Sequence, residues 1–260
     1  MKLKILVLGD VVGKPGRNII KNKVCKYIED EKINFCVVNA ENAAGGSGIT
    51  RQIAEDLFAA GVSVITMGDH IWKRKEVFGL LTDERRIIRP ANYSPDALGF
   101  GSVVINTVFG QSIGIINLLG RVFMKPIDCP FRLVKRIVQK MSAETNIIIV
   151  DMHAEATSEK IAMGWFLDGQ VSVVFGTHTH VQTADETILP NGTAYMTDLG
   201  MTGAYNSILG RKTENVLRAI VTQMPASFEV ADDDVRACGA SIMVDSETGR
   251  AESIQRVVIK

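Results

Sequence analysis

The chain has 260 residues, of which 46% are hydrophobic, so it can bury the core of one large α/β domain or of two small ones. Its 29 basic and 29 acidic residues cancel, which excludes a general basic surface for nucleic acid or anionic membrane. No apolar stretch approaches the roughly 18 residues of a membrane span, and four cysteines without a C-x-x-C pair predict free thiols in a cytoplasmic protein. Affinity for phosphate must therefore come from a local feature such as a metal.

The N-terminal part of the chain alternates between predicted strands and predicted helices. Short apolar runs are typical of strands buried on both faces, at residues 5–8, 35–38 and 62–66. Apolar residues at helical spacing predict helices over 17–31 and 53–60, the second with Thr50 as its N-cap. This alternation indicates βαβ units and a parallel sheet.

The remainder of the chain adds antiparallel pairing. Two hairpins are expected, one joining 102–109 to 112–119 and one joining 240–244 to 254–259. Between them we expect helices at 130–141 and 211–223 and strands at 146–150 and 171–175. Because no repeat, linker or shift in composition interrupts the sequence, residues 1–260 are predicted to form a single domain of mixed sheets with outer helices.

All four histidines follow predicted strands. His70 and His153 each come after an apolar run, and a third run leads into His178 and His180. Residues i and i+2 of an extended segment point the same way, so the last two imidazoles can face one centre or bracket two ions. Open α/β sheets place their ligand crevices at the carboxyl ends of strands, where these residues fall.

Oxygen ligands occur at the same predicted strand ends, at Asp10, Glu41, Asn42 and Asp69. Carboxylate and imidazole ligands together suit Mn, Fe, Zn or Co, and the set exceeds what one ion needs, so it favours a two-metal hydrolytic centre. Each residue alone has an ordinary explanation as a cap, a turn residue or a buried structural histidine. Their joint position at strand ends favours the metal site.

The glycine-rich segment at 9–16 does not fit a nucleotide loop. Only three residues separate Gly9 from Gly13, and Pro15 follows Lys14, whereas the Walker spacing requires four residues and then Lys-Ser/Thr. The Gly-x-Gly-x-x-Gly pattern is also missing, so a nucleotide-binding domain without metal is disfavoured. Arg17, close to the start of the expected helix, is a candidate phosphate contact.

Seven motifs, in order along nearly the whole chain, resemble the YmdB-like branch of the calcineurin-like metallophosphoesterases. They are Gly-Asp-Val-Val-Gly-x-Pro-Gly-Arg at 9–17, Asn-Ala-Glu-Asn at 39–42, Met-Gly-x-His-x-Trp at 67–72, Arg-Pro-Ala-Asn-Tyr at 89–93, Asp-x-His-Ala-Glu at 151–155, Gly-Thr-His-Thr-His at 176–180 and Thr-Asp-Leu-Gly-Met-Thr-Gly at 197–203. The resemblance implies a four-layer αββα sandwich of two mixed sheets flanked by helices. It also implies two divalent ions (Fe, Mn or Zn) and phosphodiesterase activity, with 2′,3′-cyclic nucleotides among the substrates.

The resemblance also implies a role for each motif residue. One ion would take Asp10, Glu41 and His180, with Asn42 as a further ligand. The other would take Glu41 as a bridging ligand, with Asp69, His153 and His178. His70 would act as general acid while a metal-bridging hydroxide attacks phosphorus, and the pocket walls would include Asn92, Tyr93 and Thr202.

Two positions depart from the family pattern. The family carries Gly-Asn-His where this chain has Asp69 before His70, and it usually carries Asp where this chain has Lys73. Aspartate keeps an oxygen in place and adds one negative charge, which should tighten the binding of divalent cations.

Two other functions stay open for the same residues. The centre could serve a phosphomonoesterase or a broad phosphoesterase, or a regulatory metal-binding protein whose catalysis is weakened by Asp69. The expected partner is a small phosphodiester, either a cyclic nucleotide or an RNA-derived one, without stable nucleic-acid binding or membrane contact. The resemblance also implies a homo-oligomer.

Overall fold

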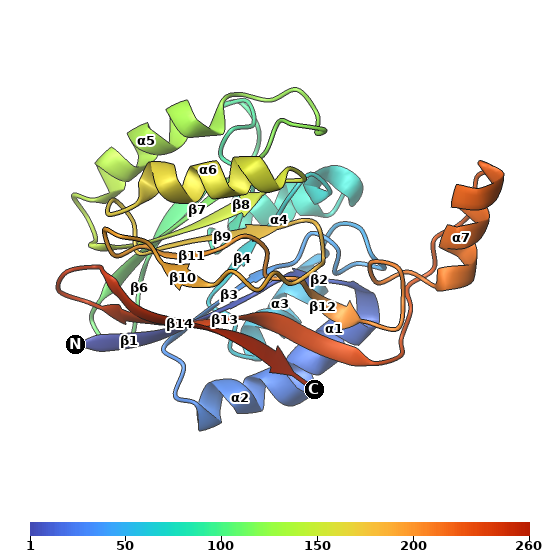
Figure 1. Ribbon diagram of the computed structural model, residues 1–260, viewed down its shortest axis with the longest axis horizontal. Helices are drawn as coiled ribbons and strands as arrows, with labels where there is room; N and C mark the ends of the chain where they lie inside the picture. Colours follow the sequence, from blue (N-terminus) through green and yellow to red (C-terminus); the bar gives the residue numbers. More distant parts are fainter.

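The computed structural model describes residues 1–260 and contains two β-sheets that lie face to face (Figure 1). The larger, eight-stranded sheet has the order β2-β12-β13-β1-β3-β4-β5, and β14 pairs with β13 outside this path. Its strands are β1 (Lys2–Leu8), β2 (Asp10–Val11), β3 (Phe35–Asn39), β4 (Val64–Thr66), β5 (Ile87–Ile88), β12 (Met201–Ala204), β13 (Val235–Asp245) and β14 (Ala251–Ile259). Parallel pairing of β1, β3, β4 and β5 agrees with the predicted βαβ units.

The smaller, six-stranded sheet has the order β10-β11-β9-β8-β7-β6. Its strands are β6 (Ser102–Asn106), β7 (Ser112–Leu119), β8 (Ile147–His153), β9 (Val173–Thr177), β10 (Thr187–Ile188) and β11 (Ala194–Met196). The antiparallel pairs β6–β7 and β13–β14 confirm the two predicted hairpins. Both sheets are therefore mixed.

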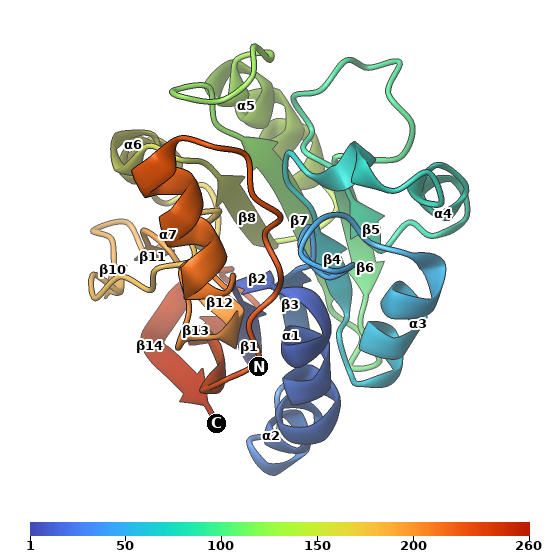
Figure 2. The ribbon, with the colours of Figure 1, turned by 90° about the vertical axis from the view of Figure 1, so that its right-hand side faces the viewer.

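Helices cover the outer face of each sheet. The larger sheet carries α1 (Gly13–Ile19), the π-helical turn η1 (Ile20–Val24), α2 (Cys25–Asp30), α3 (Arg51–Ala59) and α4 (Val77–Asp83). The smaller sheet carries α5 (Pro130–Met141) and α6 (Thr157–Leu167). A short 3-10 turn, η2 (Ile71–Lys73), follows the His70 loop, and α7 (Thr213–Thr222) stands apart from both sheets (Figures 1 and 2). None of these helices combines the length and apolar character that a membrane crossing needs.

Three apolar cores separate the four layers. Strand β1 shows the principle, because Ile5 and Val7 face the smaller sheet while Leu6 and Leu8 face the helices. Between the sheets, these residues meet Ile115 and other side chains of the smaller sheet. A strand covered on both faces must be apolar at every position, which is why its sequence is a continuous apolar run. The αββα sandwich implied by the resemblance is confirmed.

Three boundaries differ from the sequence prediction in ways that matter for the site. The first helix begins at Gly13 and not at Arg17, because Pro15 falls in the first turn, where its missing N–H is not needed. Strands β8 and β9 run past the predicted ends at 150 and 175, to His153 and Thr177. His153 is therefore fixed within the sheet itself, since it pairs with Thr177 across the two strands.

Candidate metal centre

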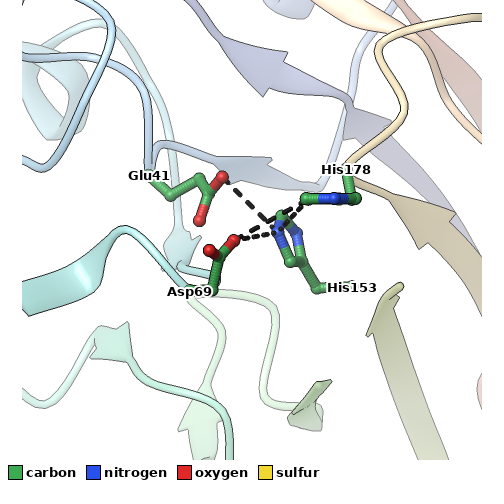
Figure 3. Close-up of side chains that lie close together, drawn as sticks. All are labelled: Glu41, Asp69, His153 and His178. Carbon is green, nitrogen blue, oxygen red and sulfur yellow. Dashed lines mark hydrogen bonds and ion pairs between the residues drawn. The ribbon is translucent and has the colours of Figure 1, made fainter. Parts of the chain in front are cut away.

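Four side chains from separate strand ends converge on one point. His153 ends β8, His178 follows β9, Glu41 follows β3 and Asp69 follows β4, and Figure 3 shows the four pointing toward one another. One ligand atom from each lies within 4.8 Å of the others. The Nε2 atom of His153 lies 3.4 Å from Glu41 Oε1 and 3.1 Å from His178 Nδ1. The buried strand ends thus place two imidazoles and two carboxylates around a single centre.

A second group of ligands adjoins this cluster. His180 Nε2 lies 3.8 Å from Asp10 Oδ1 and 3.2 Å from Asn42 Nδ2. Glu41 Oε1 is 3.2 Å from the same Asn42 nitrogen. Glu41 therefore lies between the two groups, as a bridging ligand must.

The cluster has the properties of a cation site. Asp10 Oδ1 and Asp69 Oδ1 are buried and accept no hydrogen bond from the protein. A buried carboxylate oxygen without a donor is costly, and a divalent cation would satisfy it. Mixed imidazole and carboxylate ligands suit transition metals better than the all-oxygen sets of calcium. The residues present therefore fit a divalent transition metal.

The pKa shifts show how strongly these groups interact without a cation. Burial acts to raise the pKa of Glu41, but the charges of His153 and His70 lower it to about 2. Burial likewise opposes ionisation of Asp69, yet the nearby charges of His153, His70 and His178 lower the pKa of that carboxyl. Burial acts to lower the pKa of His153, but Glu41, Asp69 and Asp10 raise it well above its ordinary value. A positive charge at this point stabilises the ionised carboxylates, and a bound cation would supply that charge.

The buried side of the centre orients His153. Its Nδ1 lies 2.9 Å from Thr177 Oγ1, and that hydroxyl donates to Asp151 Oδ1 at 2.7 Å. Since the hydroxyl proton is used on Asp151, Thr177 accepts the Nδ1 proton of His153, which leaves Nε2 as the free ligand nitrogen. Asn39 adds its side-chain amide, 3.2 Å from Asp151 Oδ2.

The two histidines of the Thr-His-Thr-His loop are oriented in the same way. His180 Nδ1 donates to the carbonyl of Leu209 at 3.1 Å, so its Nε2 faces Asp10. In His178 the two ring nitrogens have exchanged roles. Its Nε2 lies 3.1 Å from Glu155 Oε2, and its Nδ1 faces the cluster. An outer partner on one ring nitrogen fixes the other nitrogen as a ligand.

This loop has an unusual backbone that a buried ion pair holds in place. His178 and His180 have φ angles of 97° and 64°, in the left-handed region that side chains other than glycine seldom adopt. Thr179, between them, donates its hydroxyl to Asp198 Oδ2 at 2.7 Å. Lys160 Nζ binds the same oxygen at 2.6 Å, with both side chains only 1% exposed.

His70 lies beside the ligands on the wall of a cavity of about 330 Å³. Its Nδ1 is 2.8 Å from Asn42 Oδ1, and its backbone N–H donates to Glu41 Oε2 at 2.9 Å. The Nδ1 proton is therefore engaged by Asn42, and Nε2 makes no hydrogen bond to the protein. One third of the side chain is exposed, so it can reach a bound molecule.

The four predicted substrate contacts are placed differently. Tyr93 packs edge-on against Trp72, with ring centroids 5.7 Å apart, and its pKa rises to about 12 because of burial and the charges of Asp69 and Glu41. It therefore lies beside the centre. Neither Tyr93 nor the other three line the cavity, and the substrate roles of all four stay predictions.

Each of these three is occupied or enclosed by the protein. Asn92 donates its buried amide to the carbonyls of Leu119 and Asp128. Arg17 donates to the carbonyl of Ala43, and Thr202 is fully buried in β12.

Sequence patterns missed most of the supporting residues. Asp151 did carry a signal, because it is an acid inside the apolar run of β8. Thr177 and Glu155 adjoin or lie close to histidines, but nothing in the sequence indicates which ring nitrogen they contact. Leu209 contributes a backbone carbonyl, for which side-chain chemistry gives no signal.

We expect cluster variants to lose metal affinity in a graded way. His153→Ala removes the central ligand and should abolish stoichiometric Mn²⁺ or Zn²⁺ binding. Asp69→Asn keeps an oxygen but loses one charge, so its affinity should fall on the order of tenfold. Elemental analysis and calorimetry measure both effects. Wild-type metal affinity in His153→Ala would contradict this site.

Removal of the buried lysine should destabilise the protein. Lys160→Met leaves Asp198 buried without its cation and should lower the free energy of unfolding by about 3–5 kcal/mol. Urea denaturation measures this change. Lys135→Met, an exposed lysine on α5, is the matched control and should change it by less than about 0.5 kcal/mol. Equal losses in the two variants would show that the buried pair contributes nothing of its own.

Comparison with solved structures places the chain among close structural relatives. A crystal structure of a hypothetical protein from Thermus thermophilus matches with a TM-score of 0.90 and 39% identity, over 98% of both chains. A crystal structure of a novel phosphatase from Mycoplasma pneumoniae matches with a TM-score of 0.92 and 36% identity, over 100% of this chain and 95% of that chain.

Sequence comparison leads to the same group. The 2′,3′-cyclic-nucleotide 2′-phosphodiesterase of Bacillus subtilis (strain 168) is 44% identical over 257 residues, which cover 99% of this chain and 97% of that protein. The family model described as YmdB-like protein matches residues 6–257. The resemblance inferred from the seven motifs is confirmed, and the chain belongs to the YmdB-like protein family.

Proposed function

We propose that this protein is a metal-dependent phosphodiesterase that hydrolyses 2′,3′-cyclic nucleotides. The observation that carries the proposal is the convergence of the ligand cluster with His70 on the wall of one cavity. The relative from Bacillus subtilis, at 44% identity over nearly the whole chain, is named for that activity. A cavity of about 330 Å³ suits a small phosphodiester, such as a mononucleotide derived from RNA.

The ligand geometry supports a pair of ions, with iron, manganese or zinc as the candidates. Glu41 would bridge them. One ion would be held by Asp10 and His180, the other by Asp69, His153 and His178. The Asn42 amide nitrogen that faces His180 is a donor, so Asn42 would support the first ion without binding it. When bound, such a pair offsets the negative charge that builds on the phosphate and makes a water molecule nucleophilic at neutral pH.

His70 supplies the proton for the leaving group. In hydrolysis, a water oxygen bonds to phosphorus, the bond from phosphorus to the 2′ oxygen breaks, and that oxygen takes up a proton to give a 3′-phosphate. Asn42 accepts the Nδ1 proton of His70, so the proton that is donated is the one that the imidazolium form carries on its free Nε2. The backbone N–H of His70 donates to Glu41, which holds the backbone of His70 in place.

A substrate panel tests the proposal directly. Protein loaded with Mn²⁺, Fe²⁺ or Zn²⁺ should hydrolyse 2′,3′-cyclic AMP to the 3′-phosphate, and bis-p-nitrophenyl phosphate more slowly. The monoester p-nitrophenyl phosphate should be the poorest substrate. Faster turnover of the monoester than of either diester would favour a phosphomonoesterase. Stoichiometric metal without turnover of any of the three would favour a regulatory metal-binding protein.

The role of His70 predicts a leaving-group dependence. His70→Ala should lower kcat for 2′,3′-cyclic AMP by about 10²–10⁴-fold, because the 2′ alkoxide needs a proton. The loss should be much smaller for bis-p-nitrophenyl phosphate, whose nitrophenolate leaves without one. Metal content, measured by elemental analysis, should stay at the wild-type value. Equal losses for the two substrates would rule out a general acid at this position.

A further inference from the structure

The cavity beside the metal centre has two unlike walls. Metal ligands and His70 form one wall. The rest of the lining includes an apolar wall of side chains from the segment that carries α7, namely Ile208, Leu209, Val216 and Phe228. Hydrolysis itself does not require an apolar surface, so this second wall calls for a separate explanation.

The apolar wall is built on a closed backbone hairpin. Arg211 bridges to Val230, and Lys212 N–H donates to the carbonyl of Glu229 at 2.9 Å. The chain therefore leaves and re-enters the fold at adjacent points, with α7 projecting between them (Figure 2). The carbonyl of Leu209 accepts the Nδ1 proton of His180 at 3.1 Å, which ties the wall to a metal ligand.

Arg211 is the cation that borders this wall, and its guanidinium is already hydrogen-bonded within the protein. Arg211 donates to the carbonyl of Phe228 at 3.0 Å, to that of Gly45 at 3.3 Å and to that of Gly46. With three backbone carbonyls as acceptors, its guanidinium has little capacity left for a phosphate. These bonds instead fix the backbone of Phe228 at the edge of the cavity.

Large apolar side chains remain open to solvent on this wall. Leu209 is 49% exposed and Phe228 is 48% exposed, although each borders the cavity. Apolar surface in a concave site is typical of a ligand contact. An aromatic ring presents a flat face on which any nucleobase can stack, whatever its hydrogen-bonding pattern.

We propose that this wall is the nucleobase subsite and that Phe228 is its stacking residue, an inference that rests on the proposed function. Phosphate at the metal ligands and a base against Phe228 would then occupy the same cavity. Recognition by stacking predicts that all four bases are accepted. Purines should be preferred over pyrimidines, because they cover more of the ring.

The test compares a nucleotide with a substrate that lacks the base. With metal-loaded protein, Phe228→Ala should raise KM for 2′,3′-cyclic AMP by roughly tenfold to a hundredfold. KM for 1-O-methylribose 2′,3′-cyclic phosphate should not change. Phe228→Trp should retain the wild-type KM for both. Val221→Ala, which truncates a residue on α7 that is 78% exposed and outside the cavity, should alter neither.

A binding measurement separates this inference from the proposed activity. Calorimetry compares adenosine 3′-monophosphate with inorganic phosphate on metal-loaded protein, whether or not turnover occurs. Wild type should bind the nucleotide at least tenfold more tightly, and Phe228→Ala should lose that difference. A subsite at Phe228 is overturned if wild type binds both alike, or if Phe228→Ala weakens the base-free substrate as much as the nucleotide.

Discussion

The carboxylates at the metal centre are the constraint on which the rest of the structure depends. Asp10, Glu41 and Asp69 meet at one edge of the molecule, two of them with a buried oxygen that no protein donor satisfies. Without a cation, these carboxylates interact instead with the imidazole of His153. Although burial acts to lower the pKa of His153, their negative charge raises it. Such a site is stable only if the surrounding fold prevents the acids from moving apart, because their buried oxygens have no protein donor to offset the charge.

The sandwich provides that rigidity. His153 ends a strand that is paired on both sides, and Thr177 and Asp151 hold its ring from within the core. Residues 178–180, beyond the end of β9, lack strand pairing, and there the Lys160–Asp198 pair holds the backbone through Thr179. Strand pairing and a buried ion pair thus perform the same task at neighbouring positions.

Sequence patterns predicted the parallel sheet and the convergence of histidines and acids at its edge for physical reasons. Strands buried on both faces leave continuous apolar runs, as in β1, and ligands that follow such runs must meet at a common sheet edge. The contacts that support the ligands could not be predicted from the sequence, because they depend on how each side chain is oriented in the fold. Nothing in the sequence shows that Nε2 of His178 faces Glu155, or that the side-chain amide of Asn92 donates to backbone carbonyls. Phe228 is separated from every motif and reaches the cavity only through the hairpin that carries α7.

The contact between Leu209 and His180 has a consequence for how the family can diversify. His180 is anchored by the carbonyl of Leu209, and a carbonyl is present whatever side chain occupies that position. Mutation at 209, or along the rest of the apolar wall, can reshape the cavity while the imidazole keeps its anchor. Natural selection can thus alter which molecules are accepted without rebuilding the machinery that cleaves them.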